Sequence, residues 1–86
     1  MSVDSPPHGT PEIADLTHAI ERDPDAPVNY LLRGETWLIC GEPDRAHADF
    51  ETARNLVADL LNKSEWGYIY QAYLDRADAG LRRCHV

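Results

Sequence analysis

The chain has few basic residues and no long apolar run. Its 86 residues include 8 Lys and Arg against 15 Asp and Glu, which gives a formal net charge of −7. Nucleic acids and anionic membrane surfaces attract proteins through clustered Lys and Arg, so we expect neither as a partner. No apolar stretch approaches the roughly 20 residues that cross a bilayer as a helix. We therefore expect no membrane-spanning segment.

Cysteine is also scarce, since only Cys40 and Cys84 occur. A small secreted domain usually carries more cysteines, paired in disulfides. The first residues contain neither the basic region nor the apolar stretch of a secretion signal. These features predict two free thiols and a cytoplasmic protein.

Metal-binding and nucleophile motifs are missing as well. The histidines do not pair at the i, i+4 spacing of helical metal ligands, and no Cys-x2-Cys spacing occurs. The glycines are scattered and do not form a phosphate-binding loop. We expect no metal, no cofactor and no enzymatic activity. The histidines are His8, His18, His47 and His85. The serines Ser2, Ser5 and Ser64 stand outside any nucleophile context.

Neighbouring carboxylates occur at Glu42 with Asp44 and at Asp49 with Glu51. Two carboxylates can divide acid and base roles in catalysis. On a helix such residues are more often solvated charges, or charges at the positive end of the helix dipole. We interpret both pairs in this second way.

The chain does have enough apolar residues for a core, at 43%.

Residues 1–9 are rich in proline and show no periodic pattern of apolar residues, so we expect a disordered N-terminal lead-in there. Ile13, Leu16 and Ile20 then follow at spacings of three and four, which predicts a helix over 10–22. We expect residues 10–86 to form a single helical domain.

Turn residues separate this first helix from the next. Pro24 disfavours a helical conformation at Asp23. Asp23 and Asp25 therefore flank a proline turn, where we expect them to cap helices. Gly41 suits the left-handed stop of a second helix, and Pro43 suits the first position of a third.

The helical stripes place the remaining helices at about 26–40, 43–62 and 64–83. The last of these holds its apolar period without punctuation, so we favour one continuous helix over a chain that bends near Leu74. No alternating strand pattern appears. The sequence thus predicts an all-α fold of about four antiparallel helices.

Small and aromatic residues recur at fixed spacing in the middle of the chain. The motif runs Tyr30-x2-Arg33-Gly34-x2-Trp37 and continues as Ala46-x3-Phe50-x2-Ala53. This pattern resembles the tetratricopeptide repeat (TPR) family, whose unit is a helix-turn-helix of about 34 residues. The small residues would let helices approach closely, and the aromatic residues would fill the space between them. The positions expected to pack the repeat are Tyr30, Gly34, Trp37, Ala46, Phe50 and Ala53.

The resemblance covers one full repeat, 27–60, flanked by half-repeats. It implies antiparallel helix-turn-helix units forming a fragment of an α-α superhelix. Ala58 stands where the family has a terminal proline, so we expect the third helix to run on. A plain helical hairpin with the same small residues is the rival interpretation.

The resemblance implies a protein–protein interaction module, an adaptor or scaffold whose apolar groove binds a partner peptide or helix. Members that bind peptide carboxylates use Lys and Asn in the groove, and apart from Asn29 these are absent here. A basic or apolar partner suits the acidic charge better. For Leu31 and Leu38, plain core packing is an equally good interpretation. The predicted groove residues are Val28, Leu31, Glu35, Leu38 and Ile39.

Two other functions are open. One is a structural self-association module that binds no foreign ligand. Its groove would be filled by its own fourth helix or by a second copy, as a homodimer paired through that helix. The other is an acidic inhibitor that occupies a basic site on another protein. The predicted dimer face is Trp66, Ile69, Tyr70 and Tyr73.

Overall fold

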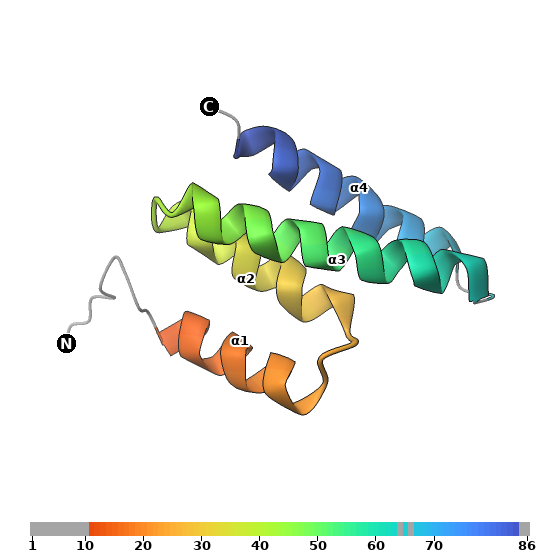
Figure 1. The fold of residues 1–86 in the computed structure, drawn as a ribbon, viewed down its shortest axis with the longest axis horizontal. Coiled ribbons are helices and arrows are strands. Elements are labelled where there is room, and N and C mark those ends of the chain that lie inside the picture. Colours follow the sequence, from red (N-terminus) through yellow and green to blue (C-terminus); the bar gives the residue numbers. More distant parts are fainter. Residues whose placement is uncertain (1–10, 64, 66, 85–86) are drawn as a thin grey trace.

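The computed structural model describes residues 11–63, 65 and 67–84. The expected lead-in over 1–9 and the predicted dimer residue Trp66 lie outside these residues. The described chain forms four helices and no strand: α1 (Pro11–Arg22), α2 (Pro27–Ile39), α3 (Pro43–Lys63) and α4 (Gly67–Arg83) (Figure 1). The predicted all-α fold is confirmed. None of these helices is long and apolar enough to cross a membrane.

The helix bounds follow the local sequence signals closely. For the first three helices each end lies within one residue of the expected position, whereas α4 begins at Gly67 and not at 64. The fourth helix is continuous through Leu74, so the bend considered there does not occur. The third helix does run on, to Lys63, as the absence of a proline at Ala58 predicts.

The turn between α2 and α3 shows why the helix ends there. Gly41 has a φ of 77°, in the left-handed region that glycine tolerates best. Its N–H donates to the carbonyl of Leu38 at 3.0 Å, and the N–H of Glu42 donates to that of Trp37 at 2.8 Å. These bonds satisfy the last carbonyls of α2. Pro43 then begins α3.

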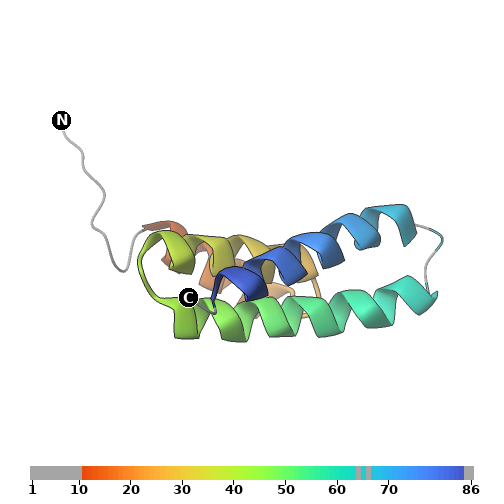
Figure 2. The ribbon, with the colours of Figure 1, turned by 90° about the horizontal axis from the view of Figure 1, so that it is seen from above.

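The helices are arranged in chain order. α2 and α3 form an antiparallel hairpin, and α4 runs back along α3 (Figures 1 and 2). α1 lies on the other side of α2, and within the described residues it contacts no other helix. α4 also reaches α2 along part of its length. Each helix therefore packs mainly on the one before it.

The core is centred on Phe50 of α3, which is fully buried between Gly34 of α2 and Gly80 of α4. A Cβ added at Gly34 would lie 2.9 Å from Cε1 of Phe50, and one at Gly80 would lie closer still. Neither position has room for a side chain. The other buried members of this cluster are Leu31, Ala46, Ala53 and Ala77, with Tyr30, Trp37, Leu38, Tyr73, Leu81 and Cys84 packed at its edge.

Candidate functional site

A cleft forms where the helices differ in length. α3 has 21 residues and α2 has 13, so at ~1.5 Å per residue α3 is about 12 Å longer. Its C-terminal turns extend past the start of α2, and α4 begins alongside them. In Figure 2 the ribbons of α3 and α4 spread apart toward this end. The first turns of α4 therefore stand opposite the start of α2 with space between them.

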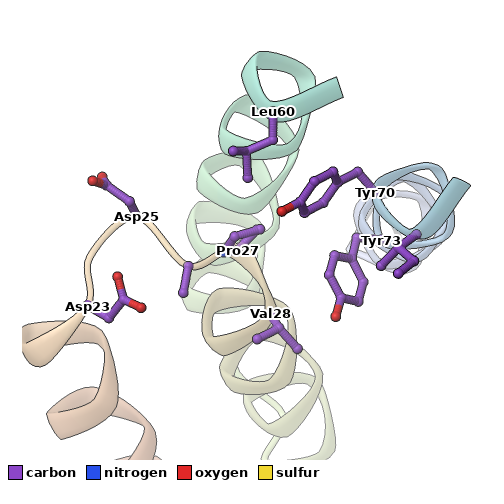
Figure 3. A pocket seen from close by; sticks show the side chains of 9 residues that line it. Asp23, Asp25, Pro27, Val28, Leu60, Tyr70 and Tyr73 are labelled. Carbon is purple, nitrogen blue, oxygen red and sulfur yellow. The ribbon is translucent and has the colours of Figure 1, made fainter. Parts of the chain in front are cut away.

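This space is a cleft of about 560 Å³. α3 contributes Leu60, and α4 contributes Tyr70 and Tyr73, which extend toward Pro27 and Val28 of α2 (Figure 3). The rings of Tyr70 and Tyr73 have centroids 6.2 Å apart and planes inclined by 57°. The walls are thus mainly apolar. The full lining is Asp23, Asp25, Ala26, Pro27, Val28, Leu60, Ile69, Tyr70 and Tyr73.

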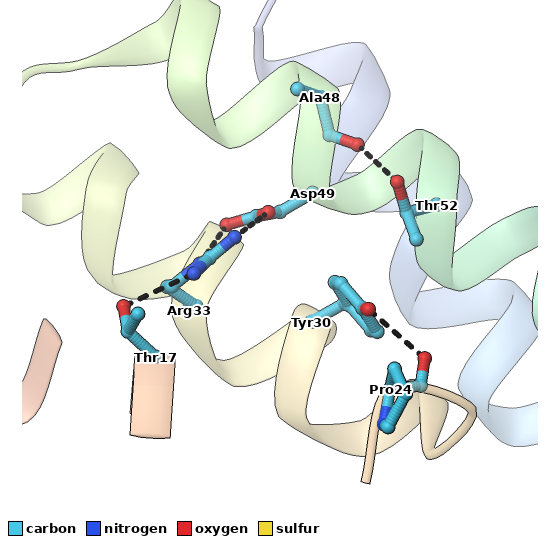
Figure 4. Close-up of polar contacts among 7 residues, drawn as sticks. All are labelled: Thr17, Pro24, Tyr30, Arg33, Ala48, Asp49 and Thr52. Atoms are coloured by element: carbon cyan, nitrogen blue, oxygen red, sulfur yellow. Dashed lines mark hydrogen bonds and ion pairs between the residues drawn. The ribbon is translucent and has the colours of Figure 1, made fainter. Parts of the chain in front are cut away.

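The acidic rim of the cleft comes from the connection between α1 and α2, which carries Asp23 and Asp25 (Figure 3). The hydroxyl of Tyr30 donates to the carbonyl of Pro24 at 2.9 Å and ties this connection to α2 (Figure 4). Within residues 11–63, 65 and 67–84, no side chain forms an ion pair with either carboxylate. Their negative charge is therefore available to a ligand.

The five predicted groove residues are placed in different environments. Leu31 is fully buried in the core, and Leu38 packs at the core edge. Glu35 accepts hydrogen bonds from Arg76 of α4, with Nη2 to Oε1 at 2.7 Å. Only Val28 lines the cleft. Ile39 is 82% exposed at the opposite end of α2.

The predicted dimer residues of α4 line the cleft. Tyr70 and Tyr73 are half-buried there, while Ile69 is 37% exposed. Tyr68 was not among the predicted residues, and it is 71% exposed. The aromatic residues of α4 are thus divided between the inner wall of the cleft and the outer surface.

Asp49 was expected to be a solvated charge, and that interpretation is wrong. It is only 4% exposed. Arg33 donates to both of its oxygens at 2.8 Å and to the hydroxyl of Thr17 at 3.1 Å (Figure 4). The hydrogen bond to Asp49 raises the pKa of Arg33. A planar guanidinium matched to both carboxylate oxygens is what makes this burial possible, and it joins α1, α2 and α3.

Among the described residues no group of three His, Cys, Asp or Glu could hold a metal ion. Cys40 and Cys84 are free thiols. Burial raises the pKa of the Cys84 thiol, which lowers the thiolate fraction available for reaction.

Comparison of the chain with protein-family models, with curated proteins and with solved structures gives no match. Inference about function therefore rests on the geometry of the cleft.

Proposed function

We propose that this chain is a protein–protein interaction module, a TPR-like adaptor that receives a segment of a partner protein in the cleft between α2, α3 and α4. Two features support the TPR-like arrangement. The helices pack in chain order, and Phe50 fills the close approach at Gly34. The rest of the proposal depends on the cleft itself.

The observation that carries the proposal is an apolar cleft that opens to solvent beside an acidic connection. A volume of about 560 Å³ falls within the roughly 300–1,000 Å³ of known ligand sites. Apolar surface exposed in one place marks sites of association more often than single exposed residues do. Val28, Leu60 and Ile69 supply such surface, and nothing in the described chain fills the space between them.

A matched pair of isoleucine substitutions tests where the partner docks. Ile69 lines the cleft, whereas Ile39 lies at the other end of α2 and belonged to the groove predicted from sequence. Both are exposed, so Ile69→Glu and Ile39→Glu should each fold as the parent chain does. Random twelve-residue peptides would be selected for binding to the parent chain, and the affinities of the selected peptides measured for both variants.

We expect Ile69→Glu to weaken the selected peptides at least about tenfold, which corresponds to roughly 1.4 kcal/mol. Ile39→Glu should leave their affinity within about twofold. The opposite ranking would move the docking surface to the Ile39 end and overturn the cleft assignment. A selection that yields no binder would count against an interaction module of this kind.

Self-association through α4 is a second candidate, favoured by the exposure of Tyr68 and Ile69. A second copy would bury both residues about a twofold axis. Sedimentation equilibrium separates the two functions. A monomer at micromolar concentration rejects self-association, while a dimer whose dissociation constant rises for Tyr68→Ser supports it.

A further inference from the structure

We propose that the partner segment enters the cleft with a lysine or arginine side chain, whose apolar stem lies along the cleft walls and whose charge meets Asp23 and Asp25. This inference rests on the proposed function and specifies the chemistry of the partner. The occupant is a basic peptide segment of another protein. The reasons are the order of groups along the cleft, its charge and the fixed position of its rim.

The first reason is the order of chemical groups along the cleft. Its walls are hydrocarbon and tyrosine rings from α2, α3 and α4, and Asp23 and Asp25 lie at its edge on the α1–α2 connection. In Figure 3 both aspartates are on the far side of Pro27 from the tyrosines, and the Asp25 side chain is directed away from Tyr70 and Tyr73. Lysine and arginine are amphipathic in the same order, with an apolar stem and a charged head. Tyr70 and Tyr73 also offer aromatic faces, which attract cations. A leucine would gain nothing from the two carboxylates.

The second reason is where the negative charge remains uncompensated. Elsewhere in the described chain, several acidic side chains are paired, as with Asp49 and Arg33, Glu35 and Arg76, or Asp78 and Arg54. Others, such as Glu12 and Asp15 of α1, form no ion pair within the described residues but lie outside the cleft. Asp23 and Asp25 have no such partner within those residues, and the cleft lining includes no Lys, Arg or His. An acidic partner would therefore be repelled at this site and a basic one attracted.

The third reason is that the acidic connection is held in place. The hydroxyl of Tyr30 donates to the carbonyl of Pro24, between the two aspartates (Figure 4). The N–H of Ala26 donates to the carbonyl of Asp23 at 3.3 Å, which closes the turn. A backbone held in place before binding loses less conformational freedom when the ligand arrives. The site thus favours a cation at low ordering cost.

Four peptides that differ at one position test the inference. Each is a fluorescein-labelled nine-residue peptide of alanine and leucine with a central lysine, arginine, norleucine or glutamate. Norleucine retains the lysine stem and lacks the ammonium group. Binding to the full chain is followed by fluorescence anisotropy at low and at physiological salt. We expect the lysine and arginine peptides to bind about tenfold tighter than norleucine at low salt, and glutamate to bind most weakly.

Matched variants test which carboxylates the lysine side chain of the peptide contacts. The double variant Asp23→Asn, Asp25→Asn should bring lysine and norleucine to within about twofold of each other. The double variant Glu12→Gln, Asp15→Asn removes the same charge from α1 outside the cleft and should keep most of the difference. Thermal melts followed by circular dichroism confirm that each variant is folded. A loss of discrimination in the α1 variant alone would overturn the assignment to Asp23 and Asp25.

The remaining outcomes separate this inference from the proposed function. If norleucine binds as tightly as lysine and Ile69→Glu abolishes both, the cleft is a docking site and the basic partner is wrong. If no peptide binds, both proposals fail. Nα-acetyl-lysine methylamide, which keeps the side-chain ammonium group, serves as a free cation. If it binds as tightly as the lysine peptide, the cleft is a small-molecule site and the peptide partner is wrong.

Discussion

The bundle has a closed end and an open end, and side-chain size accounts for much of the difference between them. At the closed end, Gly34 and Gly80 let α2 and α4 approach the ring of Phe50 closely. At the open end, α4 presents Tyr70 and Tyr73 to Val28 and Leu60, and a cleft remains. The same helices thus form a core at one end and a binding surface at the other. Gly34 and Gly80 allow the closest approach at the closed end, and the greater length of α3 leaves the cleft at the other.

This difference indicates how a chain of 86 residues can be folded and still offer an apolar surface. The closed end is further secured by the ion pair of Arg33 and Asp49, which lie next to Gly34 and Phe50 in the sequence. Stability is therefore concentrated near Phe50. Substitutions there should mainly affect folding, and substitutions at the open end should mainly affect binding.

The largest effect is expected from Gly80→Ala. A methyl group there would overlap the ring of Phe50, which is fully buried and cannot move away. Overpacking outweighs the gain in helix propensity of up to about 1 kcal/mol, and we expect a net loss of about 2 kcal/mol. For a domain of this size this lowers Tm by roughly 10 °C. Thermal and urea unfolding followed by circular dichroism would measure it.

Two further glycine variants sharpen this prediction. Gly34→Ala meets Phe50 at a longer distance and should cost less, about 1 kcal/mol. Gly67→Ala places its methyl group 3.9 Å from Leu61, an ordinary contact, and should change stability by less than about 0.5 kcal/mol. If Gly80→Ala were as stable as Gly67→Ala, close approach at Phe50 would not be what closes this end.

The two glycines also show how far the sequence predicts the fold. Gly34 stands in a recognisable pattern with Trp37 and Phe50, so its close approach could be predicted. Gly80 is an isolated glycine near the end of a helix, and nothing nearby in the sequence links it to Phe50. That link depends on how α4 lies along α3, which local periodicity does not specify.

The candidate site was harder to predict than the helices. Val28, Ile69, Tyr70 and Tyr73 were singled out from sequence, but Val28 was placed in a groove and the other three in a dimer face. These residues line one cleft because the C-terminal turns of α3 extend past the start of α2. Asp23 and Asp25 were predicted to flank a turn and to cap helices, but the N-cap residue of α2 is Ala26, with no side-chain cap hydrogen bond. Their place at the edge of the cleft follows from tertiary packing, which the local sequence does not specify. Asp49 was missed because charge at a helix position says nothing about which residue faces it.

The next largest effect is expected from Asp49→Asn at the closed end. The amide is nearly the same size but loses the charge and one of the two acceptors of Arg33. Removing one member of a buried ion pair leaves the other charge poorly compensated. Arg33 keeps some contact with solvent, so we expect a loss of about 1.5 kcal/mol in the free energy of unfolding.

A surface pair supplies the control for this prediction. Asp59 and Lys63 form an i, i+4 ion pair at 3.0 Å with both side chains exposed. Asp59→Asn should change stability by less than about 0.5 kcal/mol. Equal losses in urea unfolding of the two variants would show that burial adds nothing to the Arg33 pair, and the closed end would then depend on packing alone.

The smallest effect is expected from Tyr30→Phe, which removes the hydroxyl that holds the Pro24 carbonyl and leaves the ring in place. Because this hydrogen bond is exposed, its loss should cost only about 0.5 kcal/mol of stability. We expect peptide binding to be affected more than stability, because the connection that carries Asp23 and Asp25 is then no longer held beside the cleft. We expect the affinity of the lysine peptide to fall about threefold while that of the norleucine peptide stays the same. If the variant loses stability but binds both peptides like the parent chain, the rigidity of the connection does not contribute to recognition. Charge alone would then explain any preference for a basic partner.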